Sequence, residues 1–372
     1  MTLCINEALP IEMLGVIFEE HAKLEWQAPV KDGRVCRLWR QIMLHCPRAW
    51  AHLELDMIYE PDPSVLRLWL DRSGAAPLHI QADSYTPNID WLLDRHHERI
   101  ESLIVDSGPY SMFENRSFPI LQSLTVDYWN ETGTHESPWG AMPKLLDLRT
   151  CFINIDILPL STFPPLRTLA LHNVDSCDCL LRNSNNSLTS MMLEELSLDD
   201  TSGLLDFPSL TFLSLYAVKN LKRRMRVPVL TAYHEGGGTE EEDFSTPLPL
   251  LAEYGIFQPE SPPPGLLCSV TKLHQCCPNL QRLSIRAYPP DFMSFLHSFV
   301  IQPTVLPVLS ILAVGPSESG VSYGKGLEDD IIDRITDRNI TSKVKITVHF
   351  EDSEPFEVPL FFGAVCTHNR KC

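Results

Sequence analysis

The sequence predicts an α/β protein in which a small helical module precedes a series of short parallel strands. Two observations predict this architecture. Residues 9–50 carry apolar side chains at helical spacing, and from residue 118 onward one short leucine pattern returns many times. The 372 residues are 44% hydrophobic and only 21% charged, which is enough apolar material for a large buried core.

The helical module is predicted to contain two or three short helices. Pro10 suits the first turn of a helix, because the N–H that proline lacks would have no partner there. A second helix is predicted from Asp32, a good N-cap residue, to Met43, and Pro47 ends it. The apolar stripe of the first helix comprises Leu14, Ile17 and Phe18. Such short helices cannot enclose a core alone, so the module must dock against another part of the chain or against a partner.

A helix and a strand are predicted directly after the module. Asp62 is a suitable N-cap, Pro63 suits the first turn, and Gly74 suits the end of the helix. The chain then alternates between strand and helix before the repeats begin, with a strand at 78–80, a helix at 88–96 and a strand at 100–105.

The repeated pattern is apolar-Pro-x-Leu-x-x-Leu-x-apolar. Random placement of this chain's prolines and leucines would produce the Pro-x-Leu-x-x-Leu core about 0.6 times. Tyrosine replaces the second leucine in two further copies, and a copy without the proline is assigned to residues 193–198. The complete copies begin at Pro119, Pro143, Pro164, Pro208, Pro278 and Pro307. Most steps between copies lie in the range of about 20–29 residues that is typical of leucine-rich repeats.

The pattern has a simple physical meaning. Leu-x-Leu places two side chains inward on a short strand, and the residue between them faces outward. Each unit exposes an apolar flank that only the next unit can cover, so we expect an irregular solenoid with a parallel sheet on one face. It resembles the degenerate leucine-rich repeats that follow fungal F-boxes. A helix at 327–338 and a strand at 344–350 are expected to cap its last unit.

Ordered blocks in the first 80 residues carry that F-box resemblance. They are Leu9-Pro10-x-Glu12-x-Leu14-x-x-Ile17-Phe18, then Val35-Cys36-Arg37-x-Trp39-Arg40-x-Ile42, then Pro47-x-x-Trp50, and finally Leu66-x-x-Trp69-Leu70-x-Arg72-Ser73-Gly74-x-x-Pro77-Leu78. The resemblance implies that the module docks a Skp-type adaptor and, through it, a cullin. The implied contact residues are Leu9, Pro10, Leu14, Ile17, Phe18, Val35, Cys36, Trp39 and Trp50. One departure is that residues 19–33 lack the leucine cluster of many F-boxes.

The predicted organisation has four segments. They are an F-box-like helical module at 1–56, a linking helix-strand-helix segment and N-terminal cap at 57–99, a leucine-rich-repeat-like solenoid at 100–320, and a C-terminal cap and tail at 321–372. Glycine- and glutamate-rich or proline-rich stretches predict loop insertions in the solenoid at about 236–248 and 258–265.

Composition and motifs exclude several function classes. A net charge of −18 disfavours nucleic-acid binding. The cysteines are scattered without zinc-ligand spacing, and no motif predicts a catalytic residue, a metal or a cofactor. Prolines interrupt the uncharged stretch at 292–317, so no membrane span is expected. Without a secretory signal, the expected location is the cytoplasm or the nucleus, with reduced thiols.

The outward positions of the strands form the predicted surface for a target protein. Aromatic and arginine side chains often anchor protein interfaces, and here they comprise Phe212, Tyr216, His234, Phe257, Arg282 and Arg286. The expected function is therefore that of a non-enzymatic substrate receptor in a Skp–cullin–F-box ubiquitin ligase. The alternative is an interaction scaffold whose degenerate F-box has no ligase role. The basic run at 222–226 is either a nuclear import patch or a loop that offsets nearby acidic residues.

Overall fold

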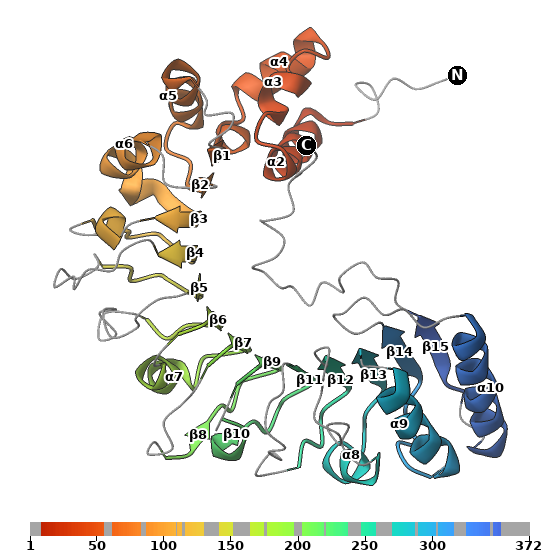
Figure 1. Cartoon of the computed structure of the whole chain (residues 1–372). Helices are drawn as coiled ribbons and strands as arrows, with labels where there is room; N and C mark the ends of the chain where they lie inside the picture. Colours follow the sequence, from red (N-terminus) through yellow and green to blue (C-terminus); the bar gives the residue numbers. More distant parts are fainter. Residues whose placement is uncertain are drawn as a thin grey trace, which may run out of the picture. The chain divides into compact units, whose positions relative to one another are not determined.

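In the computed structural model, the chain forms two compact units. Figure 1 labels the helices and strands of both. Unit 1 comprises residues 1–151 and 157–164, and unit 2 comprises residues 152–156 and 165–372. Both units combine helices with parallel strands, which confirms the predicted α/β class. The four-segment division stays a prediction. The described residues are 9–55, 62–82, 87–108, 110–113, 116–129, 141–151, 164–174, 177–196, 203–218, 221–236, 247–257, 270–286, 289–302, 304–315, 325–342 and 345–350.

Unit 1 joins the N-terminal helices to a parallel sheet. Its strands follow the chain in the order β1-β2-β3-β4-β5, and each pairs in parallel with the next. The helices are α2 (Ile11–Leu24), α3 (Ala28–Asp32), α4 (Arg37–Leu44), η1 (Pro47–Trp50), α5 (Pro63–Ser73), α6 (Pro87–His96), η2 (His97–Arg99) and η3 (Tyr110–Phe113). The strands are β1 (His52–Leu55), β2 (Leu78–Ala82), β3 (Ile100–Gly108), β4 (Ser123–Trp129) and β5 (Asp147–Cys151).

The predicted helix from Asp32 to Met43 is present only from Arg37 onward, as α4, so its predicted start is wrong. Asp32 is the last residue of the short helix α3, and a turn separates α3 from α4. Gly33 permits this turn, because a Cβ atom at that position would lie 3.0 Å from the carbonyl oxygen of Pro29. Cys36 is extended, and its Sγ caps α4 by accepting a hydrogen bond from the Trp39 N–H at 3.5 Å.

The helix after the module follows its capping signals. The Asp62 side chain accepts a hydrogen bond from the Ser64 N–H at 2.7 Å, Pro63 occupies the first turn, and Gly74 at the C-cap has a φ of 55°. The predicted helix at 88–96 and strand at 100–105 are also present as α6 and β3.

Unit 2 contains a longer parallel sheet. Its strands again follow the chain, in the order β6-β7-β9-β11-β12-β13-β14-β15, and β8 pairs with β10 in a small separate sheet. The strands are β6 (Thr168–His172), β7 (Ser190–Glu194), β8 (Leu205–Asp206), β9 (Phe212–Tyr216), β10 (Met225–Arg226), β11 (Ala232–Gly236), β12 (Glu253–Phe257), β13 (Arg282–Arg286), β14 (Ile311–Gly315) and β15 (Thr347–Phe350). The helices are α7 (Asp178–Ser184), η5 (Lys222–Arg224), α8 (Val270–Cys276), α9 (Pro289–Ile301) and α10 (Lys325–Ser342).

The second leucine of each repeat lies on a strand and points into the core. Leu213, Leu283 and Leu312 are fully buried in β9, β13 and β14. One predicted copy is wrong: the strand lies at 190–194, with Met191 and Leu193 inward, and Met191 pairs in register with Leu169. The repeat unit there begins five residues earlier than predicted because methionine replaces its leucine.

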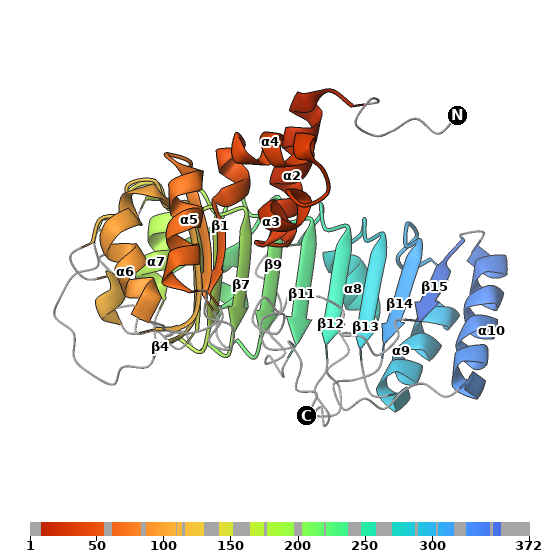
Figure 2. The same ribbon diagram turned by 90° about the horizontal axis from the view of Figure 1, so that it is seen from above.

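Helices α7 to α10 lie on one side of the unit 2 strands, and no described helix of unit 2 lies on the other side (Figures 1 and 2). We call this side the open face of unit 2. The predicted C-terminal helix and strand are present as α10 and β15. The predicted loop insertions fall mainly outside the described residues.

Candidate interaction surfaces

The N-terminal helices carry two different apolar surfaces. The inner one packs within unit 1: Leu14 and Phe18 of α2 are each only 1% exposed. Trp50 of η1 is also buried, and its indole N–H donates to the Met43 carbonyl oxygen at 2.8 Å. Helix α5 supplies the docking surface, since Trp69 contacts both Trp50 and Trp26, with ring centroids 5.0 and 5.4 Å away.

The outer surface of the same helices remains in solvent. Val16 and Ile17 of α2 are 52% and 43% exposed, and Val35, in the turn before α4, is 62% exposed. We call the outer apolar set the module face: it comprises Ile11, Met13, Val16, Ile17, Val35 and Leu44. Half of the 14 large apolar side chains that are exposed in the described part of the structure lie within residues 11–44, so this end of unit 1 is a candidate interaction surface.

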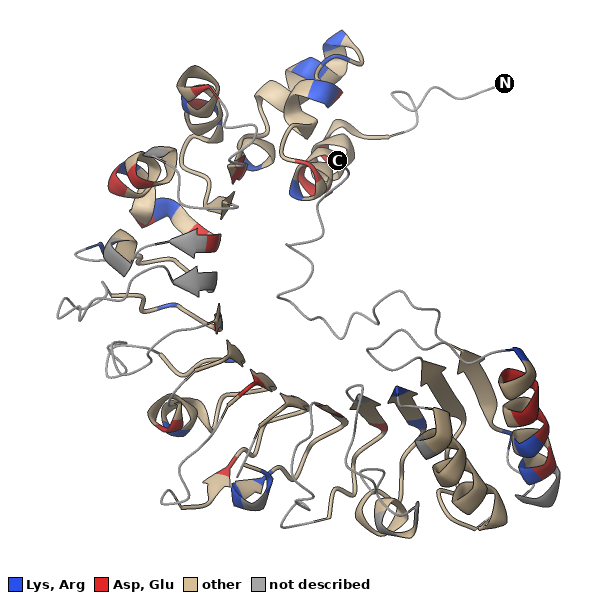
Figure 3. Ribbon diagram, viewed as in Figure 1, with Lys and Arg blue, Asp and Glu red and all other residues tan. Residues whose placement is uncertain are grey.

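Basic side chains accompany the module face. Residues 28–50 carry five arginines or lysines and one aspartate, although the whole chain has a net charge of −18. All five are exposed, and Figure 3 shows Lys and Arg residues on α3 and α4. They are Lys31, Arg34, Arg37, Arg40 and Arg48. Two of them, Arg34 and Arg40, line a hollow of about 280 Å³ together with residues that include Val30, Leu44 and Trp50. Lys31 forms an ion pair with Glu25, so the four arginines are the positive charges that an acidic partner segment would meet.

The predicted adaptor residues divide between the two surfaces. Ile17, Val35 and Pro10 are exposed, and Leu9, Cys36 and Trp39 are half-buried. The Trp39 ring packs on Phe18 with centroids 4.9 Å apart, so Trp39 belongs partly to the core. The buried members, Leu14, Phe18 and Trp50, hold the helices together from inside.

The predicted target-binding residues gather on the open face of unit 2. They come from four adjacent strands, β9, β11, β12 and β13, and the strand register aligns them in rows. Phe212 lies in one row with Ala232, Glu253 and Arg282. The row four residues further along contains Tyr216, Gly236, Phe257 and Arg286, with His234 in the row between them. The side chain of Phe257 lies outside the described part of the structure.

Contacts across these rows hold several side chains in place. The His234 ring meets Phe212 edge to face, with centroids 5.4 Å apart. Glu253 lies between two of the predicted residues: its Oε1 is 3.6 Å from His234 Nε2 and 3.6 Å from Arg282 Nε. The hydrogen bond from His234 lowers the pKa of Glu253 below its usual value, aided by the Arg282 charge. Gly315 on β14 makes room for Arg286, because a Cβ there would lie 3.0 Å from Arg286 Cγ.

Two basic residues of the run at 222–226, Lys222 and Arg224, are buried and paired within unit 2, whereas Arg226 is exposed. Lys222 forms an ion pair with Glu235, and Arg224 donates to Asp178 at 3.2 Å. Both basic side chains are buried, so they are not displayed as an import signal would be. Of the two readings of this run, the structure favours charges that offset nearby acidic residues. The acidic run at 240–243 lies outside the described residues.

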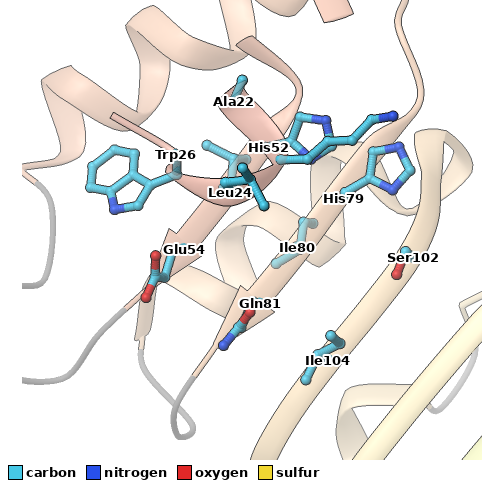
Figure 4. A pocket seen from close by; sticks show the side chains of 12 residues that line it. Ala22, Leu24, Trp26, His52, Glu54, His79, Ile80, Gln81, Ser102 and Ile104 are labelled. Carbon is cyan, nitrogen blue, oxygen red and sulfur yellow. The ribbon is translucent and has the colours of Figure 1, made fainter. Parts of the chain in front are cut away.

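Unit 1 also contains a pocket that the sequence patterns did not indicate (Figure 4). Its volume is about 210 Å³. Outward side chains of β1, β2 and β3 form its floor, and the end of α2 with Trp26 forms its wall. His52 and His79 are register partners on β1 and β2, and their rings stack with centroids 4.7 Å apart and planes at 11°. The remaining lining residues are Ala22, Lys23, Leu24, Leu53, Glu54, Ile80, Gln81, Ser102 and Ile104.

Burial shifts the two pocket histidines further toward their uncharged form. It lowers the pKa of His52 to about 4, and the charges of His79 and Lys23 act in the same direction, against Glu20. The pKa of His79 is also lowered by burial, although Glu101 on β3 opposes this.

No group of three or more His, Cys, Asp or Glu side chains is placed to hold a metal ion in the described ranges. Within the same ranges, no helix has both the length and the apolar character that crossing a bilayer requires. No protein-family model and no curated protein sequence matches the chain.

Proposed function

We propose that this protein is the substrate-recognition subunit of a Skp–cullin–F-box E3 ubiquitin ligase. In this proposal, the N-terminal helices dock the Skp-type adaptor, and the open face of unit 2 binds the target protein. The single observation that carries the proposal is the exposed module face, since its apolar side chains stay in solvent although the same helices already pack on α5.

Helix α2 has two apolar sides with different surroundings. Leu14 and Phe18 form the buried apolar side of α2, and their packing stabilises this short helix. Packing within unit 1 therefore does not account for Val16 and Ile17 on the other side of the helix. The order of sequence blocks in this segment resembles an F-box, and the module face with its basic rim offers the apolar and electrostatic contacts that adaptor docking requires.

The open face of unit 2 is the proposed target site. Its aromatic and arginine side chains lie in register over four strands, and mixed polar and aromatic rows suit a protein surface. The contribution of the chain to ubiquitin transfer is to hold the target close to the loaded conjugating enzyme. It supplies no catalytic residue of its own in this proposal.

One observation favours a second candidate, an interaction scaffold outside any ligase. Trp50, one of the residues implied in adaptor docking, is buried against Trp69 of α5. N-terminal helices that pack against α5 of the same chain could have a purely structural role, as a cap on the first strands of the sheet. Adaptor binding separates the two candidates.

The experiment is co-expression of the full chain with a tagged Skp-type adaptor, followed by capture on the tag. The test variant replaces Ile17 and Val35 with glutamate. Both side chains are exposed, so the change leaves the core intact and places two carboxylates on the module face. We expect stoichiometric capture of the wild type and at least a tenfold loss for the variant.

The matched control is Leu204→Glu, at an apolar side chain of unit 2 that is 60% exposed. We expect it to bind the adaptor as the wild type does. Folded wild-type protein that retains no adaptor would eliminate the ligase proposal and leave the scaffold.

A further inference from the structure

The pocket in unit 1 lies at one end of an outward strand surface. Two outward rows cross the sheet: one contains His52, His79, Ser102, Ser123 and Asp147, and the next contains Glu54, Gln81, Ile104, Thr125 and Arg149. The end of α2 stands over the first three strands and closes the rows into a pocket (Figure 4). The same rows continue over β4 and β5, where Thr125 is buried and Ser123, Asp147 and Arg149 are half-buried.

The size of the pocket limits what it can hold. Sites for drug-sized ligands and cofactors usually span about 300–1,000 Å³. This pocket has about 210 Å³, which is enough for one large amino-acid side chain. If this side chain belongs to a peptide, the rest of the peptide can extend along the adjoining rows.

The lining indicates the chemistry of the occupant. Leu24 and Trp26 supply an apolar wall, and Ile104 supplies an apolar part of the floor (Figure 4). Burial shifts the two stacked histidines further toward their uncharged form. Lys23 and Glu54 at the rim have opposite charges, so neither sign dominates. Such a lining favours an uncharged side chain, with imidazole, amide and hydroxyl groups available to the backbone that carries it.

The exposed position of Leu24 also favours an apolar occupant. This side chain is 88% exposed although it borders the pocket. Covering an apolar group that is held in solvent stabilises the complex.

We infer that this pocket receives one uncharged apolar or aromatic side chain from a target peptide that extends across the outward face of β1 to β5. The inference rests on the proposed function for the source of the peptide. It adds a second anchoring point for the target, separate from the open face of unit 2.

The test uses uncharged and charged probes on the full chain. N-acetyl-phenylalaninamide and N-acetyl-leucinamide represent the occupant, and N-acetyl-lysinamide and N-acetyl-glutamic acid amide represent the charged alternatives. Binding is followed by saturation-transfer NMR with increasing probe concentration. We expect saturable binding of the uncharged pair and at least tenfold weaker binding of the charged pair.

Two variants locate the binding. Ile104→Trp fills the pocket from β3, and we expect it to weaken uncharged-probe binding at least tenfold. Met192→Trp makes the same kind of change on an outward, half-buried position of β7 in unit 2, and we expect binding to match the wild type. Circular dichroism of both variants checks that they are folded.

Three results would overturn the inference: no saturable binding of either uncharged probe, tighter binding of a charged probe, or equal binding by wild type and folded Ile104→Trp. The assay contains no adaptor. A failed adaptor capture therefore leaves the pocket assignment standing, and a failed probe titration leaves adaptor docking standing.

Discussion

Trp50 and Trp69 meet edge to face in unit 1, with ring centroids 5.0 Å apart and ring planes at 71°. Trp50 ends the N-terminal helices, and Trp69 lies on α5, the helix between β1 and β2. Trp69 also contacts Trp26, and its indole N–H donates to the Trp26 carbonyl oxygen at 3.4 Å. One side chain of α5 thus contacts two separate parts of the N-terminal segment, the turn after α2 and the helix η1.

Replacement of Trp69 by alanine should therefore destabilise unit 1 strongly. The side chain is only 4% exposed, and removal of a buried tryptophan costs about 3–5 kcal/mol through lost burial and the remaining cavity. Urea unfolding followed by circular dichroism measures this loss without relying on the fluorescence of the deleted ring. Leu68→Ala, at a neighbouring position that is 42% exposed, should change the free energy of unfolding by no more than about 0.5 kcal/mol. Equal effects of the two substitutions would contradict the role of Trp69.

A second network of buried contacts, centred on Glu235, lies in the interior of unit 2. Glu235 occupies an inward strand position, where most other repeats have an apolar residue. Burial alone would raise the pKa of its carboxyl group. The Lys222 charge and hydrogen bonds from Lys222, Tyr254 and Tyr233 outweigh that effect and lower the pKa below its usual 4.5. The Tyr233 hydroxyl donates to Glu235 Oε2 at 2.8 Å.

Because of this network, replacement of Glu235 should destabilise the protein more than replacement of Lys222. Glu235→Leu removes the acceptor of one ammonium and two hydroxyl groups and leaves Lys222 buried, so we expect a loss of about 3–5 kcal/mol. Lys222→Met leaves the carboxylate with its two tyrosine donors, so a smaller loss is expected. Chemical denaturation of the two single variants and the double variant measures the coupling. A double variant as unstable as the sum of the single variants would rule out the coupling.

The carboxylate also fixes the sign of a pH effect. Because the folded-state pKa of Glu235 is lowered, its contribution to stability is present above pH 4.5 and is lost as the pH falls through the folded-state value. The Glu235→Leu variant should lack this part of the loss of stability at acid pH.

The strands were predictable because their signal is local. A proline before the strand and two inward leucines on it define each unit without reference to the rest of the chain, and most predicted strands are present. The prediction was wrong at 190–194 because Met191 holds the leucine position, and the nearby Leu196 offered a better match to the pattern. Likewise, the capping residues of α5 predicted its ends, whereas the break between α3 and α4 depends on the close approach of Gly33 to Pro29.

The interaction surfaces were less predictable because they depend on tertiary contacts. Ile17 and Phe18 are neighbours in one apolar stripe, yet Phe18 is buried and Ile17 is exposed. Only tertiary packing within unit 1 separates them. The pocket escaped prediction for the same reason: His52 and His79 lie in different strands, and only the parallel register stacks their rings.

The strand ends in unit 2 repeat a strained backbone conformation. Asn173, Glu195 and Ala217 each directly follow a strand, and each has a φ near 50°. Their N–H groups extend the ladder: that of Ala217 donates to the Gly236 carbonyl oxygen at 3.0 Å. This conformation costs an L-residue about 1–2 kcal/mol, whereas glycine adopts it freely.

Ala217→Gly should therefore stabilise unit 2 by about 0.5–1 kcal/mol after allowance for the greater entropy of unfolded glycine. Ala232→Gly is the matched control, since Ala232 lies within β11 and glycine inside a strand costs about 0.5–1 kcal/mol. The two urea midpoints should move in opposite directions. A shift of both midpoints to lower urea would show that the conformation at Ala217 is not strained.

The stacked histidines of unit 1 predict a pH dependence of stability. His52 has a folded-state pKa of about 4 and an ordinary value of 6.5, so between these values the unfolded chain binds more protons than the folded protein. Stability should consequently fall as the pH drops from 6.5 to about 4. With allowance for partial solvent exposure, the His52 contribution is about 1–2 kcal/mol.

His52→Gln should be less sensitive to acid over this range than the wild type, whereas His349→Gln, at an exposed position on β15, should match the wild type. The comparison requires urea midpoints at about pH 7 and about pH 4.5 for all three proteins, which bracket most of the titration. Identical acid losses in wild type and His52→Gln would mean that His52 is protonated as easily in the folded protein as in the unfolded chain.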